Sequence, residues 1–395
     1  MTGGLPRTGR EVVDRARELR PVLAKDAVRI DAEGADPTEN MRLLGEAGLH
    51  RISVPAEFGG LWEGGLYGGW RETVEAITEI AAADGSTGQC WATTALVARE
   101  LYGSDLDAGT KRQLAGELMH EGRRFVASNA ETGGTGPVTG RRVDGGLVVS
   151  GTKTFNTDSG GGGRDLACVS FALPGPDGAS ARHHALVRLD DPALEARGDW
   201  DNMGQRGTFS QTIVYRDVFV PDGWHFASHE PDPYFLCAVM LLHAAILQGI
   251  GEGAFEAAVG YLRELDRPSM PRFGSASADP LIHRQLGEMS SELAAGRALM
   301  VTTAAELADP PVDAGEMGIR GFRSKVASTR AGLDVSSRLH DLTGARSTSN
   351  RYRFDRFWRN ARTFGSHDSL DVKNALIGDY ELAGKFPILS DYVKF

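Results

Sequence analysis

Residues 233–265 read PYFLCAVMLLHAAILQGIGEGAFEAAVGYLREL, and they decide the expected architecture of the C-terminal half of the chain. The stretch is long and apolar, with small residues where other helices could approach closely, which predicts a buried helix. It includes GIGEGA at 249–254, which fits the G-x-G-x-x-A form of a dinucleotide-binding turn. Such a turn needs a strand before it and a helix that begins at it, whereas the preceding FLCAVMLLHAAILQ favours a helix. We therefore interpret these glycines as packing positions and expect no nicotinamide site.

The chain changes from helix to strand and back to helix around this stretch. Helical patterns fill residues 10–121, with an interruption at 84–86 and a last amphipathic pattern at 108–120. Between 123 and 221 the strand candidates are LVVSGTKTF, DLACVSFAL, HHALVRL and QTIVYRDVFVP. Later helices are expected over about 281–307, 318–342 and 368–385. The pattern predicts an α+β protein with a helical domain over 1–122, a small β-barrel or sandwich over 123–230 and a helix bundle over 231–395.

Composition excludes several classes of function. The 395 residues carry 53 acidic and 43 basic side chains, and the net charge of -10 disfavours nucleic-acid binding. Cys90, Cys168 and Cys237 lack metal-ligand spacing, and no carboxylate or cysteine cluster completes a metal set around the pair His183-His184. There is no G-x-S-x-G elbow. An apolar leader and an uninterrupted apolar stretch of membrane-spanning length are also missing, so we expect a cytoplasmic protein with no membrane segment.

Glycine makes up 50 of the 395 residues, and two glycine-rich loops flank one predicted strand. The first is SNAETGGTG at 128–136, and the second ends the run SGTKTFNTDSGGGG at 150–163. Consecutive glycines let backbone N–H groups converge on an anion or a ring edge, although each loop could also be a flexible turn. A third segment, WDNMGQRGTFS at 200–210, is either a hairpin between strands or part of a site.

Six segments, in this order along the chain, resemble the acyl-CoA dehydrogenase superfamily. They are VPAEFGG (54–60), the loop after Asn129, GTKTFNT (151–157), MGQRGTFS (203–210), YRDVFVP (215–221) and RFDRFWRNAR (353–362). The resemblance implies three domains ending in a four-helix bundle, a flavin between the β-domain and the bundle, and a homotetramer.

One departure bears on the activity. Where such dehydrogenases carry a glutamate base, the stretch ARTFGSHDSLDVK (361–373) has Asp368, preceded by His367. The HD-x-x-x-x-K pattern ending at Lys373, together with Trp200, resembles the two-component flavin monooxygenases of the same fold. That branch includes enzymes similar to dibenzothiophene monooxygenase, indole-oxygenating enzymes of natural-product pathways and amino-sugar N-oxygenases.

This second resemblance implies how such an enzyme would work. Reduced FAD or FMN would come from a separate NAD(P)H:flavin reductase, and O2 would add at the flavin C4a carbon to give a hydroperoxide. We expect oxygenation of an aromatic or heteroaromatic, indole-like small molecule. The alternatives are an amine or amino-sugar N-oxygenase, an acyl-CoA dehydrogenase with Asp368 as base, and a non-enzymatic flavin-binding relative.

The resemblance also implies site residues. Asn129 and Thr157 are the candidates for bonding the flavin oxygen adduct, and His367 could act as general acid or base because its ordinary pKa is near 6.5. Asp368 could orient His367 or cap the last helix. Trp91 and Phe364 could line an apolar substrate cavity with the aromatic flavin contacts, or be ordinary core aromatics. The expected flavin contacts are Asn129, Thr135, Phe155, Thr157, Trp200, Arg272, Gly344 and Ala345, of which Arg272 could equally be a solvated loop arginine.

Overall fold

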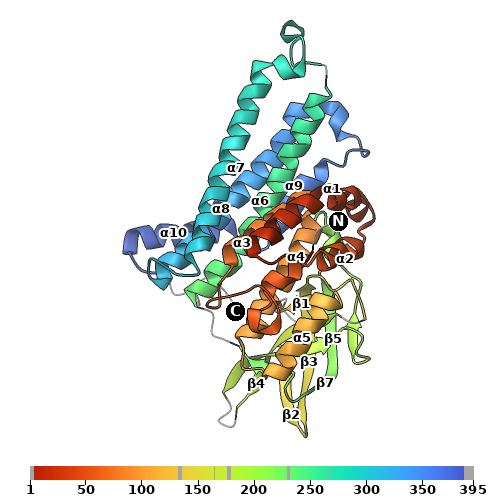
Figure 1. The fold of residues 1–395 in the computed structure, drawn as a ribbon, viewed down its shortest axis with the longest axis vertical. Helices are drawn as coiled ribbons and strands as arrows, with labels where there is room; N and C mark the ends of the chain where they lie inside the picture. The colour runs from red at the N-terminus through yellow and green to blue at the C-terminus, as the bar shows by residue number, and fades with distance from the viewer. Residues whose placement is uncertain are drawn as a thin grey trace.

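The computed structural model describes residues 4–131, 136–163, 165–175, 179–228, 232–265 and 267–386. It has three layers along its long axis: a helix bundle at one end, a β-sheet at the other, and the N-terminal helices between them (Figure 1). The N-terminal helices are α1 (Gly9–Glu33), α2 (Thr38–Glu46), α3 (Trp70–Ala83), α4 (Gly85–Gly103) and α5 (Ala108–His120).

Local caps explain where these helices begin. Asp84 accepts a hydrogen bond from the backbone N–H of Thr87, which starts α4 and separates it from α3. Asp107 starts α5 in the same way by accepting from Gly109 and Thr110. The predicted interruption at 84–86 and the predicted helix at 108–120 are both confirmed.

The β-layer is one sheet in the order β6-β7-β3-β2-β4-β5-β8, with β1 paired in parallel to β4. The four predicted strands correspond to β3, β4, β5 and β7, and the shorter strands were not predicted. Burial alternates along β7 except at Arg216-Asp217, where the pairing with β3 shifts register, in line with the partial alternation of the sequence. The strands are β1 (Phe125–Ser128), β2 (Thr139–Val143), β3 (Gly146–Asn156), β4 (Leu166–Pro174), β5 (Ser180–Arg188), β6 (Leu194–Ala196), β7 (Gln211–Pro221) and β8 (His225–Ala227).

The bundle is built around α6 (Pro233–Arg263), which packs against α3 and α8. A Cβ atom on Gly249 would lie 2.4 Å from the carbonyl oxygen of Thr78, and one on Gly253 would lie 2.2 Å from that of Ala82. The GIGEGA segment is therefore helical and close-packed, which confirms that it is no dinucleotide-binding turn. By length and composition α6 could cross a membrane, but 83% of its most apolar window is buried inside the protein.

The remaining bundle helices are α7 (Pro280–Glu306), α8 (Ala314–Thr343), α9 (Asp355–Gly365) and α10 (Leu370–Ala383). We did not predict α9 as a helix. The proposal that Asp368 caps the last helix is wrong, because Ser369 holds that position and accepts from the N–H of Val372. The carboxylate of Asp368 is engaged elsewhere, as described below.

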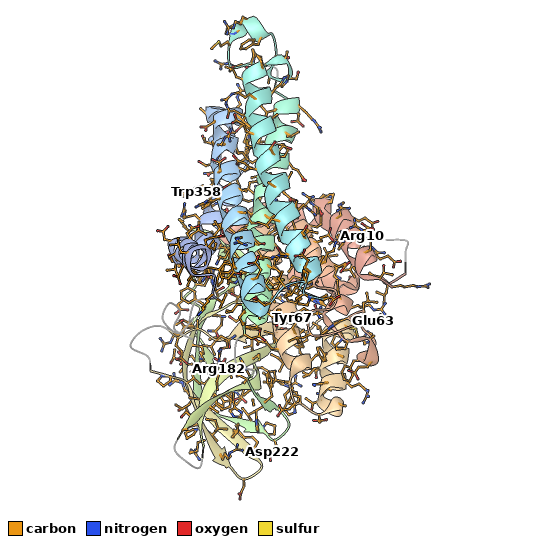
Figure 2. The ribbon with its side chains drawn as sticks, turned by 90° about the vertical axis from the view of Figure 1, so that its left-hand side faces the viewer. Arg10, Glu63, Tyr67, Arg182, Asp222 and Trp358 are labelled. Carbon is orange, nitrogen blue, oxygen red and sulfur yellow. The ribbon has the colours of Figure 1, made fainter. Side chains whose placement is uncertain are left out.

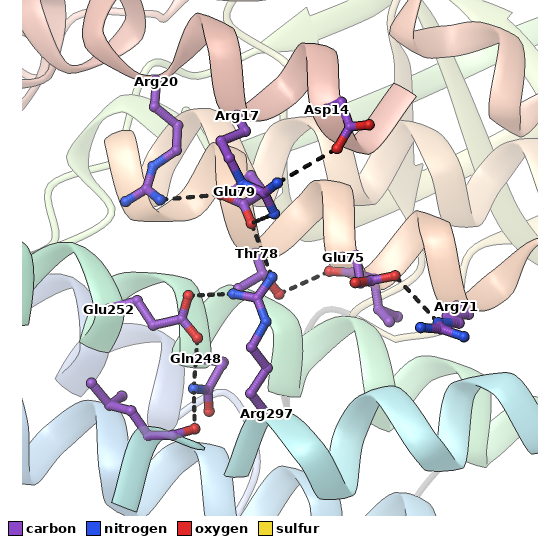
Figure 3. Close-up of polar contacts among 12 residues, drawn as sticks. Asp14, Arg17, Arg20, Arg71, Glu75, Thr78, Glu79, Gln248, Glu252 and Arg297 are labelled. Atoms are coloured by element: carbon purple, nitrogen blue, oxygen red, sulfur yellow. Dashed lines mark hydrogen bonds and ion pairs between the residues drawn. The ribbon is translucent and has the colours of Figure 1, made fainter. Parts of the chain in front are cut away.

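A buried carboxylate joins the N-terminal layer to the bundle (Figure 3). Glu79 of α3 is 2% exposed and accepts hydrogen bonds from Arg17 (2.9 Å) and Arg20 (3.1 Å) of α1 and from Arg297 (2.9 Å) of α7. Arg297 also pairs with Glu252 of α6. Four helices from two layers are thus tied through one network.

Candidate active site

A cavity of about 1300 Å³ lies where the three layers meet. Its walls come from the loop at 55–67, from α4, from the β-sheet, from α6 and from the connection between α9 and α10. Figure 2 labels Glu63, Tyr67 and Arg182 of its lining: Tyr67 lies at the level at which the bundle meets the N-terminal helices, and Arg182 lies on the sheet. Most of the lining surface is apolar, so the cavity suits an apolar ligand with a few polar contacts.

Strained backbone occurs at Phe155 in the cavity lining and in the segments next to it. Phe155 has a φ of 55° and exposes 53% of its side chain, although it lines the cavity and contacts Trp200 edge-on at 6.2 Å between ring centroids. Asp158, Gln205 and Phe209 also have positive φ values. Non-glycine residues keep such conformations only where the surrounding structure enforces them, and they cluster at ligand sites.

Thr157, two residues after Phe155, belongs to a network of hydrogen-bonded polar side chains. The Thr157 hydroxyl lies 2.9 Å from Ser210 Oγ and accepts a hydrogen bond of 3.1 Å from the amide of Gln89. The Gln205 amide then donates to Gln89 Oε1 at 2.9 Å, and the backbone N–H of Gln205 donates to Asn360 of α9 at 2.7 Å. The MGQRG segment is thereby fixed against both α4 and α9. Gln89 was not among the expected site residues, because nothing in its local sequence pattern separates it from other polar helix residues.

Asn129 directly follows β1 and lines the cavity. Its side-chain oxygen is 3.1 Å from His184 Nε2, and the other ring nitrogen of His184 is 2.8 Å from Ser228 Oγ. All three residues line the cavity. Thr135, the other expected flavin contact from this loop, lies outside the described residues.

The bundle side of the cavity carries two histidines and two lysines around one carboxylate. The rings of His367 and His243 meet edge-on at 4.6 Å between centroids, and Lys325 Nζ lies 3.3 Å from His243 Nδ1. Lys325, which is fully buried, pairs with one oxygen of Asp368, and Lys373 pairs with the other at 3.1 Å. Both carboxylate oxygens are therefore paired with lysines.

Burial and the two ammonium groups set the protonation of this cluster. His367 is open to the cavity but surrounded by protein; burial, then Lys325 and Lys373, lower its pKa to about 4. Burial and the neighbouring Lys325 likewise lower the pKa of His243. Burial and Lys373 lower the pKa of Lys325 to about 7. At neutral pH His367 is thus a neutral imidazole that can accept a proton or donate its N–H, but it has no excess proton to give.

The structure brings only some of the other expected residues to the cavity. Phe364 lines it and meets His243 edge-on at 5.2 Å. Trp91 does not: it is fully buried in the helical core, stacked on His50, because its helix turns that face away from the cavity. Arg272 belongs to the connection between α6 and α7, and Gly344-Ala345 to the connection between α8 and α9. Both connections lie at the end of the bundle remote from the sheet (Figure 1), and none of these residues lines the cavity of this chain.

Two groups of three potential metal ligands come together among the described residues, although the sequence shows no such spacing. The first is Glu100, Cys168 and His184, and the second is His243, His367 and Asp368. In the first group both ring nitrogens of His184 are in hydrogen-bonding contacts. In the second the ammonium groups beside Asp368 oppose a bound cation.

Comparison with known proteins agrees with this architecture. Residues 8–114 match the N-terminal domain of acyl-CoA dehydrogenase, and residues 241–372 match its C-terminal domain. Dibenzothiophene monooxygenase of Rhodococcus erythropolis is 32% identical over 94% of this chain and 93% of that protein. The probable FMNH2-dependent monooxygenase SfnC of Pseudomonas putida is 29% identical over 95% of this chain and 96% of that protein. The solved structure of TdsC from Paenibacillus sp. A11-2 with FMN and indole has a TM-score of 0.86 and 25% identity, covering 97% of this chain and all of that one.

The fold and the relatives together define a flavin enzyme of the acyl-CoA dehydrogenase type. More closely, the chain belongs to the flavin-dependent monooxygenases of that superfamily, as the HD-x-x-x-x-K pattern and Trp200 predicted. The residues present fit a flavin. The cavity exceeds the volume of roughly 300–1,000 Å³ usual for one ligand, which leaves room for a cofactor and a substrate together. Phe155 of the cavity lining offers aromatic surface to a flat ring, and Asn129 and Thr157 of the same lining offer polar groups; Trp200 supports Phe155 from outside the lining.

Proposed function

We propose that this enzyme oxygenates an aromatic or heteroaromatic small molecule with O2 and a reduced FMN delivered by a separate reductase. The arrangement around Asp368 carries the proposal. In the competing acyl-CoA dehydrogenase reaction a free carboxylate must remove the substrate proton, whereas here both oxygens of Asp368 are engaged by lysines. A neutral histidine pair faces the cavity instead.

Each residue has a role derived from its position. Reduced flavin, when bound, supplies two electrons for the activation of O2; one oxygen atom enters the substrate and the other leaves as water. Phe155, supported by Trp200, would hold the ring, and Asn129 and Thr157 would donate hydrogen bonds at its edge. The apolar lining excludes water from the reacting atoms. His367 accepts the proton that the substrate loses when the new C–O bond forms.

Further properties follow from the relatives and from the sequence. We propose FMN rather than FAD, since the similar structure contains FMN and the similar Pseudomonas protein is named for FMNH2. Indole, bound in that same structure, is the first substrate class to test, with thiophenes and amines next. Buried free cysteines are compatible with a reducing cytoplasm. A homotetramer could bring Arg272, Gly344 and Ala345 of a neighbouring subunit to the flavin.

Rapid mixing separates the two reactions. Protein loaded with reduced FMN is mixed with oxygenated buffer, and we expect a transient absorbance distinct from both reduced and oxidised flavin. In parallel, protein with oxidised FMN is mixed with a series of acyl-CoA esters, and we expect no reduction of the flavin. Flavin reduction by an acyl-CoA, with no transient species in oxygen, would overturn the proposal in favour of the dehydrogenase.

A further inference from the structure

His184 contacts two cavity residues, Asn129 and Ser228, although the sequence did not predict it as a catalytic or a flavin-binding residue. It lies on β5, is 4% exposed, and stacks on Phe226 at 5.3 Å between ring centroids. Its Nδ1 faces Ser228 Oγ at 2.8 Å and its Nε2 faces Asn129 Oδ1 at 3.1 Å. The backbone N–H of Ser228 donates to Arg182 of β5, so the hydroxyl is held beside the ring.

The acceptors around the ring decide where its hydrogen lies. An amide oxygen cannot donate, so the contact with Asn129 is a hydrogen bond only if Nε2 carries the hydrogen. A carboxylate oxygen of Glu100, 3.9 Å from Nε2, favours the same tautomer. Burial, with Arg182 and Lys153 nearby, lowers the pKa of His184 to about 3, so the ring is neutral and Nδ1 is an acceptor. Ser228 must therefore donate to it.

This chain of donors has a consequence for Asn129. With its oxygen bound to His184, the amide of Asn129 has a fixed orientation, and its NH2 group is the end left for other partners. If the ring carried its hydrogen on Nδ1, the amide would turn over and present its oxygen instead. Donors aimed in advance at the position of developing or bound negative charge are what oxygen-activating and anion-binding sites require.

We propose that His184 is a positioning residue that holds Asn129 with its NH2 group toward the flavin. The inference rests on the proposed function, because it assigns the flavin to this wall of the cavity. Ser228 is the second member of the unit, since its hydroxyl donates to Nδ1 and holds the ring in place.

The test compares His184→Leu and Ser228→Ala with His183→Gln. His183 is the neighbouring residue on β5, faces Phe171 and does not line the cavity, so it is the matched control. The dissociation constant of FMN is measured by fluorescence quenching, together with the share of reduced flavin that yields product rather than hydrogen peroxide. Thermal melting without flavin checks that each variant is folded.

We expect His184→Leu to weaken FMN binding by about 3- to 10-fold, the loss of roughly one hydrogen bond, and to raise the share of peroxide. Ser228→Ala should also weaken FMN binding and raise the share of peroxide. His183→Gln should change neither the dissociation constant of FMN nor the share of peroxide by more than about twofold. In an Asn129→Ala background, His184→Leu should have no further effect, because its influence passes through that amide.

Two results would overturn the inference while the proposed function stands. One is a wild-type protein that binds FMN and forms product, with His184→Leu and Ser228→Ala behaving like the control. The other is a double variant, Asn129→Ala with His184→Leu, in which the loss of FMN affinity equals the product of the two single losses. A wild-type protein that binds no FMN would overturn both the inference and the proposed function.

Discussion

The protonation of His367 is the property of a single residue that controls the proposed chemistry most directly. Its pKa of about 4 lies below the ordinary value because of burial and of the cations Lys325 and Lys373. The imidazole therefore stays neutral as the pH falls from about 8 to 6. We predict that the rate of product formation at saturating reduced flavin shows no loss attributable to His367 in this range, and that His367→Phe lowers the rate by about 100-fold.

Lys325→Met tests the cause of that shift. Removing one cation raises the pKa of His367 toward its ordinary value, so the acid limb of the rate profile should move to higher pH. The profile is measured with product formation under excess reductase. An acid limb already near pH 6.5 in the wild type, unmoved by Lys325→Met, would contradict this assignment.

A second residue-scale prediction concerns Asp158, which shares Arg124 with Asp36 and Asp165. Burial raises the pKa of Asp158 to about 7, above about 3.9 for an unfolded aspartate. The native state therefore binds its proton more tightly than the unfolded chain. This stabilising contribution is complete below about pH 4 and is lost as the pH rises through about 7.

Asp158→Asn removes that titration. We predict that the melting temperature of the variant, relative to wild type, rises steadily between about pH 5 and pH 7 and levels off at higher pH. Thermal melts in a matched buffer series measure it. A difference between variant and wild type that does not change with pH would show that Asp158 does not titrate in the folded protein in this range.

At the scale of elements, the packing of α6 against α3 depends on glycine. A Cβ atom on Gly253 would lie 2.2 Å from a backbone carbonyl of α3, whereas Gly260, on the same helix, has open space around its Cβ position. We predict that Gly253→Ala lowers the free energy of unfolding by about 1–3 kcal/mol, and that Gly260→Ala raises it by about 0.5–1 kcal/mol. Urea unfolding monitored by circular dichroism distinguishes them; equal effects at the two positions would refute the packing role of GIGEGA.

The elements also show how far the sequence could predict the structure. The helix at 108–120 and the strand at 211–221 have the predicted bounds, because a capping aspartate and an alternating pattern mark them locally. The short strands and α9 carry weaker signals. The cluster around Asp368 was only half foreseen: His367 and Lys373 are close in sequence, whereas His243 and Lys325 are 82 residues apart and meet only because α6 and α8 pack together.

At the scale of the whole molecule, Glu79 holds the N-terminal layer against the bundle. Its carboxylate is 2% exposed and receives three guanidinium groups, two of which are largely buried and one of which is half exposed. We predict that Glu79→Ala lowers the free energy of unfolding by about 3 kcal/mol, the lower end for breaking a buried ion pair. The exposed pair Arg42–Glu46 is the control, and Glu46→Ala should have no measurable effect on urea unfolding. Similar losses from both variants would count against the network.

The central claim is that the cavity between the three layers inserts one atom of O2 into an aromatic substrate. The most direct measurement is a reaction with indole, FMN, a flavin reductase and NADH under ¹⁸O2, followed by mass spectrometry of the product. We predict a product with one ¹⁸O atom from O2, formed about 100-fold more slowly by the His367→Phe variant. The claim would be contradicted if no product of indoles, thiophenes or amines contained ¹⁸O and all electrons of the reduced flavin were recovered in hydrogen peroxide.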